Sequence, residues 1–278
     1  MSRALALSLL SAVSRYSRLH TIAARQFNFA AVRPTRSFAR PFVWGTVSVL
    51  SAALLLQSAS TIHLDAPATV GDEFESDPAT SIHFPKTLRI PSKSPLPAHS
   101  LVGTGVRTVS FLGVKVYSVA FYADLQNPKL NISVTATPQE KVEHIIRNTS
   151  CVLRIVPTRN TSYSHLRDGF VRALTARLQT AKSRGKLSPA TESAAQSPLR
   201  QLKSIFPTTA IAKGHPLDIH LTAPTGDPDQ PRSLVFLDLG VVEGDWVAEE
   251  FVLAYFEGDG ISPPLKRSTL ERLKTFGK

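Results

Sequence analysis

Arg107 is a charged residue inside an apolar stretch, GTGVRTVSFLGVKVYSVAFYA at residues 103–123, which predicts two short strands joined at Gly113. Because strand side chains alternate between the two faces of a sheet, Arg107 shares a face with Val109 and Phe111. A guanidinium on an apolar face is costly unless it is paired or reaches water. Arg107 therefore either extends to water from the sheet edge or serves a molecule that binds over that face.

Other chemistry is excluded by the motifs and by the single cysteine. The run GTGVRT imitates a dinucleotide-binding loop, but Thr108 stands in place of the third glycine and the run leads into a strand. The sequence has no HExxH, GxSxG or GK[ST] motif, and its eight histidines are scattered. Cys151 is the only cysteine, so an intramolecular disulfide is excluded, and its neighbours CVLRIV predict a small core residue.

The positive charge is concentrated at the N-terminus. The chain has a net charge of +11, but residues 1–40 hold seven arginines and no acid, which leaves 25 basic and 21 acidic residues elsewhere. No RNP motif, zinc-finger spacing or basic helix with interleaved aromatics occurs, so nucleic acid is not an expected partner. A leader rich in arginine and serine and free of acids is typical of a mitochondrial presequence (transit peptide).

Residues 41–64 contain no Lys, Arg, Asp or Glu and exceed the roughly 20 residues that a transmembrane helix needs. We expect a membrane span here, with a buried helix as the alternative. An acidic linker at residues 65–78 follows. Because basic flanks stay on the matrix side, a domain at residues 79–278 is expected in the intermembrane space, anchored to the inner mitochondrial membrane.

The elements that must position Arg107 follow from periodicity. Strands are predicted at 81–90, 103–123, 150–157, 216–224 and 233–242, the last two as an antiparallel hairpin. Helices are predicted at 162–182, from Ser197-Pro198 onward, at 245–260 and at 262–276. Residues 183–198 are expected to be an exposed loop or a weak helix. No βαβ alternation is visible, so the pattern favours an α+β fold with an antiparallel sheet covered by helices.

Several of these stretches together resemble one family. FPKTLRIP, LVGTGVRTVSFLGVKVYSVAFYA, NTSYSHLRDGF and WVAEEFVLAYFEGDGISPPLKRSTLERL are similar to the chalcone isomerase family in its fungal mitochondrial branch, whose members are named for altered inheritance of mitochondria. The resemblance covers about residues 82–276. It implies an open-faced β-sandwich, a large antiparallel sheet packed against helices, with residues 183–198 as the extra loop of that branch.

The resemblance also implies two catalytic residues. Chalcone isomerases close a ring by adding a phenolate oxygen to an enone, and a cleft arginine steers the phenolate and stabilises the enolate. Arg107 matches that arginine, and Tyr163 matches the cleft tyrosine that orders a water at the substrate ketone.

Other positions depart from the plant pattern. Tyr117, or Ser118 if a gap is allowed, stands where the family has a threonine; Phe170 replaces an asparagine, and Ala248 replaces a threonine or serine. Phe170 also fits the apolar core face of its helix. The loss of these polar groups predicts that ordinary flavonoid cyclisation is absent.

Three functions follow from the resemblance. The first is binding of a hydrophobic anionic ligand, with haem foremost, because the fungal branch is associated with haem and other branches bind fatty acids. Arg107 would then lie near a propionate, and His165 is a candidate axial ligand, with a solvated helix face as its alternative role. The second is an intramolecular lyase (isomerase) that uses Arg107 and Tyr163, and the third is a scaffold with an empty cleft.

Overall fold

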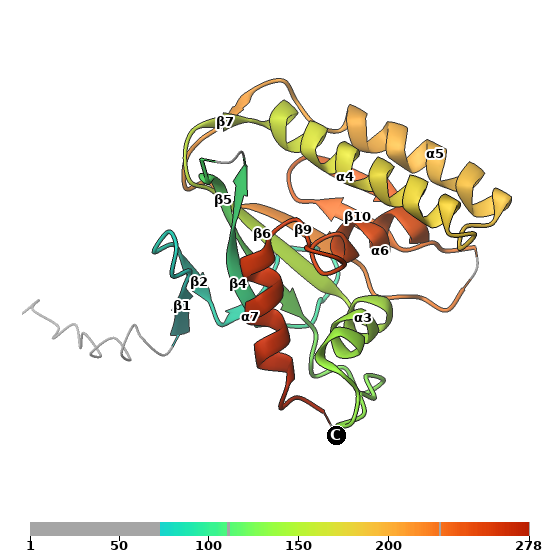
Figure 1. Cartoon of the computed structure of the whole chain (residues 1–278), viewed down its shortest axis with the longest axis horizontal. Helices are drawn as coiled ribbons and strands as arrows, with labels where there is room; N and C mark the ends of the chain where they lie inside the picture. The colour runs from blue at the N-terminus through green and yellow to red at the C-terminus, as the bar shows by residue number, and fades with distance from the viewer. Residues whose placement is uncertain (1–72, 110–111, 228, 278) are drawn as a thin grey trace, which may run out of the picture. The chain divides into compact units, whose positions relative to one another are not determined.

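The computed structural model describes residues 73–109, 112–227 and 229–277 (Figure 1). The predicted presequence (1–40) and membrane span (41–64) lie outside this part of the chain. Within it, no helix is both long enough and apolar enough to cross a membrane.

The centre of the fold is a seven-stranded antiparallel sheet with the order β11-β10-β9-β6-β5-β4-β3. Its strands are β3 (Thr87–Leu88), β4 (His99–Val109), β5 (Val114–Ala123), β6 (Cys151–Pro157), β9 (Leu217–Leu221), β10 (Ser233–Phe236) and β11 (Gly240–Glu243). The predicted hairpins β4–β5 and β9–β10 are both confirmed. Gly113 has a φ of 63° in the β4–β5 turn, a conformation that glycine adopts without strain.

Helices cover one face of the sheet (Figure 1). They are α3 (Pro138–Asn148), α4 (Tyr163–Ser183), α5 (Pro189–Ser204), α6 (Asp245–Leu253) and α7 (Pro263–Leu273). Their apolar sides and the facing strands form the larger core, which includes Phe121, Leu174 and Phe251. The α+β prediction, with one antiparallel sheet packed against helices, is confirmed.

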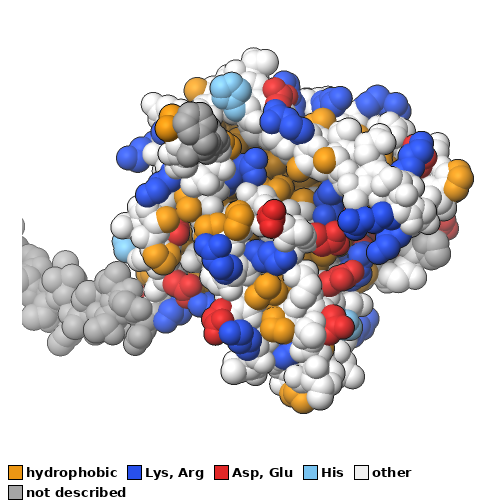
Figure 2. Space-filling view, viewed as in Figure 1, with side chains coloured by type: hydrophobic (Ala, Val, Ile, Leu, Met, Phe, Trp, Pro, Cys, Tyr) orange, Lys and Arg blue, Asp and Glu red, His pale blue; other side chains and the backbone are white. Residues whose placement is uncertain are grey.

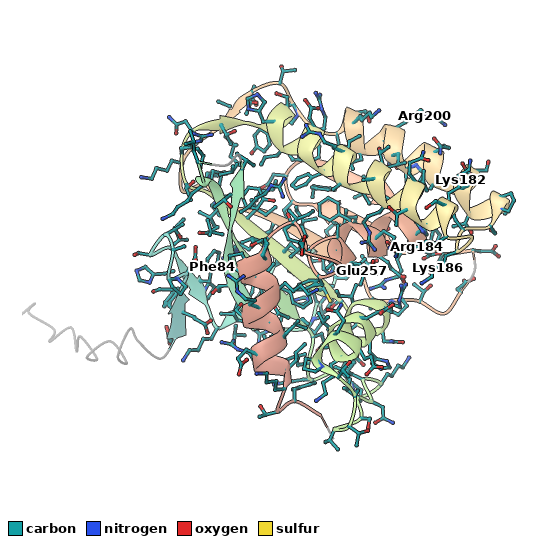
Figure 3. All side chains as sticks on the ribbon, viewed as in Figure 1. Phe84, Lys182, Arg184, Lys186, Arg200 and Glu257 are labelled. Atoms are coloured by element: carbon teal, nitrogen blue, oxygen red, sulfur yellow. The ribbon has the colours of Figure 1, made fainter. Side chains whose placement is uncertain are left out.

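The opposite face of the sheet is covered by the chain that precedes β4. Phe84, labelled in Figure 3, packs there with Leu88 and Ile90 against Tyr122 and Val152. Two short pairs complete the fold: β1 (Phe74–Ser76) with β2 (His83–Pro85), and β7 (Thr161–Ser162) with β8 (Ala210–Ile211).

The N-terminal part of the domain differs from the sequence expectation. Strand β1 lies inside the segment 65–78 expected to be a linker, and Asp77 is buried, where it accepts hydrogen bonds from Ser118 Oγ and Thr80 Oγ1. The folded part therefore begins before residue 79. Residues 81–90, predicted as one strand, form β2 and β3 in two different sheets, because Lys86 donates its N–H to the Glu73 carbonyl beside β1 and accepts at its carbonyl from the Leu101 N–H of β4.

The prediction that the helix before β8 starts at Ser197-Pro198 is wrong. Helix α5 starts at Pro189, and Ser188 Oγ accepts a hydrogen bond from the Thr191 N–H at 3.1 Å. Most of residues 183–198 is thus helical rather than a loop. Both Ser-Pro pairs carry the same helix-start pattern, and Pro198 is instead a buried residue inside α5.

Helix α3 is absent from the predicted elements, although its start is marked in the sequence. Thr137 and Glu140 form a reciprocal capping box, and Pro138 occupies the first turn. A search for this spacing would have placed the helix.

The single cysteine is a core residue, as its neighbours predict. Cys151 is fully buried, and burial raises the pKa of its thiol to about 12. We expect the folded full-length chain to leave Cys151 unmodified by a thiol reagent at pH 8, and the chain in denaturant to react with one equivalent. Absorbance of the released chromophore measures both. Rapid stoichiometric reaction of the folded chain would contradict the buried position.

Candidate functional site

The two glycines before Arg107 let α7 lie directly on β4. A Cβ at Gly105 would fall 2.2 Å from the Leu265 nitrogen, and one at Gly103 would fall 2.3 Å from Thr269 Oγ1. Ser268 Oγ donates to the Thr104 carbonyl at 2.7 Å. The glycines of GTGVRT thus serve close helix–strand packing.

Arg107 follows this packed segment and is positioned by it. Its side chain is half-buried, and its Nη1 donates to the Ile261 carbonyl, just before α7, at 2.9 Å. Tyr117 lies opposite it across the β4–β5 ladder. None of the ion pairs formed by the described residues includes Arg107, so its positive charge is left uncompensated by a carboxylate.

A cavity of about 220 Å³ opens beside Arg107, between the β4–β5 hairpin and the first half of α4. The lining contains no Asp or Glu, and its basic residues are Arg107, Arg159, Arg172 and His165. Its apolar lining is formed by Val109, Val116, Leu166, Phe170 and Ile261. A pocket with apolar walls and guanidinium groups suits a molecule that has a hydrophobic body and an anionic head.

A pair of tyrosines adds a second donor next to Arg107. The hydroxyls of Tyr117 and Tyr255 lie 2.9 Å apart and both residues are buried. Burial raises the pKa of each phenol above its usual value, although the nearby charge of Arg107 opposes this shift, so both are neutral near pH 7.

The direction of the hydrogen bond between these hydroxyls follows from their partners. Tyr255 is fully buried, and among the described residues its hydroxyl contacts no polar atom other than Tyr117 Oη. Its proton must therefore go to Tyr117 to avoid a buried unsatisfied donor. The proton of Tyr117, which lines the cavity, then remains available to a ligand.

The structure brings four of the sequence-predicted site residues together and separates the others. Arg107, Tyr117, His165 and Phe170 all line the cavity. Tyr163 lies outside this lining and packs against Phe206, with ring centroids 6.5 Å apart.

Two further predicted positions, Ala248 and Ser118, do not line the cavity. Ala248 is fully buried in the core on α6. Ser118 points to the opposite face of the sheet, toward Asp77, so Tyr117 is the residue of this strand that faces the cavity.

Phe170 has a structural role as well as a place in the lining. It is buried and contacts Phe251, with ring centroids 4.9 Å apart, and also Phe206 and Phe236. This aromatic cluster closes one side of the cavity with apolar surface. Phe170 provides no hydrogen-bonding group to a ligand in the cavity.

Three features of the site are missing from the sequence prediction: Tyr255, Arg159 and Arg172. Tyr255 lies in the predicted helix 245–260, but its contact with Tyr117 spans 138 residues of chain. The two arginines are exposed, and their pattern resembles any solvated surface. Only the fold shows that they line the same cavity as Arg107.

The chain matches a known family and several curated fungal proteins. The family described as chalcone isomerase like matches residues 97–145 and 129–270. An uncharacterized protein of Schizosaccharomyces pombe is 32% identical over 125 residues, which cover 38% of this chain and 44% of the relative. "Altered inheritance of mitochondria protein 18, mitochondrial" of Kluyveromyces lactis is 26% identical over 210 residues, which cover 64% of this chain and 62% of the relative.

A similarly named protein of Saccharomyces cerevisiae (strain AWRI1631) is 22% identical, covering 90% of this chain and 89% of the relative. The first relatives are matched over less than two thirds of their own length, 44% and 62%.

A solved structure shares the fold. The crystal structure of a fatty-acid binding protein of Arabidopsis thaliana superposes with a TM-score of 0.54 at 16% identity, covering 73% of this chain and all of that one. The family match runs through most of the domain, from β4 and its arginine to α7. The chain therefore belongs to the chalcone isomerase-like family, with curated fungal relatives named for altered inheritance of mitochondria.

Proposed function

We propose that this protein binds a hydrophobic anion in the Arg107 cavity and does not cyclise flavonoids. The observation that carries the proposal is the cavity lining, in which three arginines without carboxylate partners among the described residues face apolar walls. Arg107 and Tyr117 would both donate to the anionic head, as charge-assisted and neutral hydrogen bonds respectively.

The size of the cavity favours a slim ligand. Its volume of about 220 Å³ lies below the roughly 300–1,000 Å³ of pockets that hold drug-sized molecules. A hydrocarbon chain with a carboxylate head would place its head at Arg107 and part of its chain against Leu166 and Phe170. The name of the Arabidopsis structure, a fatty-acid binding protein, supports the same ligand class.

Haem is the second candidate, favoured by the position of His165. This histidine lines the same cavity as Arg107, so the site offers an imidazole for iron and guanidinium groups for propionates. The donor types fit haem, but the volume does not, because a rigid macrocycle would leave most of its plane outside the cavity. We therefore place haem behind a fatty-acid-like ligand.

An isomerase that uses Arg107 and Tyr163 has less support. Tyr163 packs against Phe206 and is not part of the cavity lining, which gives no support to a pairing with Arg107 on one bound molecule. Arg107 and Tyr117 are the pair that shares the cavity. Turnover of naringenin chalcone above the spontaneous rate would support the isomerase instead.

The proposed location is the inner mitochondrial membrane, with the domain in the intermembrane space. It is supported by the acid-free, arginine-rich leader, by the uncharged segment 41–64, and by curated relatives named as mitochondrial proteins. Protease treatment of mitochondria with a ruptured outer membrane tests the orientation. Degradation of the domain only after rupture is expected, and protection after rupture would contradict it.

Replacement of Arg107 by methionine tests the ligand site. A hydrogen bond from a charged group contributes about 1.5–3 kcal/mol, so we expect oleate affinity to fall about 10- to 100-fold. Calorimetric titration of the full-length chain in detergent below its micellar concentration measures this. The matched control is Arg267→Met, which removes an exposed arginine of α7 that forms no ion pair within the described residues.

The outcome separates oleate binding, haem binding and the scaffold hypothesis. Oleate binding that depends on Arg107 and not on Arg267 supports the proposal. A Soret band with haem that is lost on His165→Ala, without any oleate binding, would move haem to first place. Absence of binding to both ligands would leave the scaffold hypothesis.

A further inference from the structure

Three chain segments meet at the end of the sheet where the cavity opens. The segment 157–160 lies beside the start of β5, because the Thr158 N–H donates to the Val116 carbonyl at 3.1 Å and Thr158 Oγ1 donates to the Lys115 carbonyl at 2.9 Å. The segment 213–214 joins it, because the Lys213 N–H donates to Asn160 Oδ1 at 2.9 Å. This end of the sheet is therefore built from β5, the chain after β6, and the chain before β9.

The exposed charges on these segments are all positive. Lys115, Arg159 and Lys213 are exposed, and none forms an ion pair with another described residue. Among the described residues, Lys115 Nζ contacts the Ala79 carbonyl at 2.6 Å and no carboxylate. Residues 112–116, 157–161 and 211–216 contain no Asp or Glu.

A protruding apolar side chain accompanies these cations. Leu112 in the β4–β5 turn is 73% exposed, the highest value among the exposed large hydrophobic residues of the described chain, and Val109 nearby is 38% exposed. We call Leu112, Lys115, Arg159 and Lys213 the mouth rim. Figure 2 shows hydrophobic and basic side chains next to each other at the upper left, over the end of this hairpin.

The mouth rim is continuous with the cavity. Arg159 belongs to both, and Val109 and Val116 of the same hairpin form part of the cavity wall. A surface that combines an apolar tip with surrounding cations has the composition of an interfacial membrane-binding site, where the apolar group enters the headgroup region and the cations attract anionic lipids.

We propose that the mouth rim docks onto an anionic phospholipid surface and so places the cavity entrance against the membrane. The choice of a lipid surface over a protein partner rests on charge complementarity and on the single protruding leucine. The consequence for ligand uptake rests on the proposed function, since a water-insoluble anion could then pass between bilayer and cavity without crossing water.

The test places a fluorophore at the rim of the full-length chain. Cys151 is buried with a raised thiol pKa, so in a Leu112→Cys variant an environment-sensitive dye labels the new cysteine alone. Vesicles of equal parts phosphatidylcholine and phosphatidylglycerol are compared with vesicles of phosphatidylcholine. The matched labelling control is Val134→Cys, another exposed apolar position, at 62% exposure.

We expect the dye at position 112 to shift to the blue, and to be quenched by nitroxide lipids, with the anionic vesicles only. The dye at position 134 should not respond. Neutralising Lys115 and Arg159 together as glutamine should weaken the response by about fivefold for each cation removed. Neutralising Arg184 and Lys186, which lie on the side of the molecule away from the hairpin (Figure 3), should leave it unchanged.

Three results would overturn the docking proposal. They are no response at position 112, an equal response at position 134, or an equal loss on neutralising Arg184 and Lys186. Oleate binding by the labelled Leu112→Cys chain without vesicles is measured in parallel. Retained oleate binding with no vesicle response would reject docking alone, and a vesicle response with no oleate binding would reject the ligand proposal alone.

Discussion

Substitution of Arg232 by methionine is expected to lower the free energy of unfolding by about 3–5 kcal/mol, the typical effect of removing one partner from a buried ion pair. Arg232 is only 3% exposed and lies just before β10. Its guanidinium joins three parts of the fold. Nε donates to the Thr222 carbonyl, Nη2 to the Thr149 carbonyl, and Nη1 to Glu249 Oε1, at 2.8, 2.8 and 2.9 Å respectively.

The substitution also removes the donor that serves two carbonyls at the end of α3. Nη1 of Arg232 donates to the Ile146 carbonyl at 2.9 Å and lies 3.1 Å from the Arg147 carbonyl, two of the carbonyls that a helix C-terminus leaves without intrahelical partners. The desolvation penalty of a buried carbonyl that loses its donor, about 1–3 kcal/mol where no water enters, is part of the expected total loss.

Urea denaturation followed by circular dichroism measures the loss. Arg147→Met is the matched control, because Arg147 pairs with the same Glu249 but is 42% exposed. We expect the control to cost no more than about 1 kcal/mol. Equal losses in the two variants would show that Arg232 is not the buried link between α3, α6 and the sheet.

Substitution of Gly105 by alanine is expected to destabilise the fold by about 3 kcal/mol, at the upper end of ordinary overpacking. The added Cβ would lie 2.2 Å from the Leu265 nitrogen and 2.7 Å from its Cα, both backbone atoms that no side-chain rotation can move. Helix α7 must therefore move away from β4. Because Arg107 Nη1 contacts the Ile261 carbonyl just before α7, the same shift should weaken ligand binding.

Gly169→Ala is the control, and its expected change in stability has the opposite sign. Gly169 lies inside α4, and a Cβ there would meet no heavy atom within 4 Å. Alanine in a helix interior is favoured over glycine by about 1 kcal/mol, so this variant should gain stability. Thermal melts of both variants test the pair, and an unchanged melting temperature for Gly105→Ala would contradict direct packing of α7 on β4.

The fold could be predicted wherever a local pattern and the tertiary structure agree. Helix α7 is capped by Ser262, the first residue of the predicted helix 262–276, and α4 lies over the predicted range 162–182 and buries Leu166, Leu174 and Leu178. The start of α5 could not be chosen, because Ser188-Pro189 and Ser197-Pro198 satisfy the same local rule and only packing distinguishes them.

The candidate site likewise contains residues that a local pattern identifies and residues that only the fold identifies. Alternation along one strand was enough to identify Arg107 as a group that needs a partner. Tyr255 and Arg159 reach the site through contacts between distant segments, which a single sequence does not specify. The family resemblance assigned a role to Tyr163, whereas the fold gives the cavity position to Tyr117.

The most direct test of an anion held by Arg107 is ¹³C NMR of carboxyl-labelled oleate bound to the full-length chain, titrated with acid. Because an adjacent positive charge favours the ionised form, the bound carboxyl should keep its charge to a lower pH than the free acid. In Arg107→Met the bound resonance should be lost or should titrate at higher pH than in the wild type, whereas Arg267→Met should match the wild type. A bound carboxyl that titrates identically with and without Arg107, or no bound resonance in the wild type, would contradict the account.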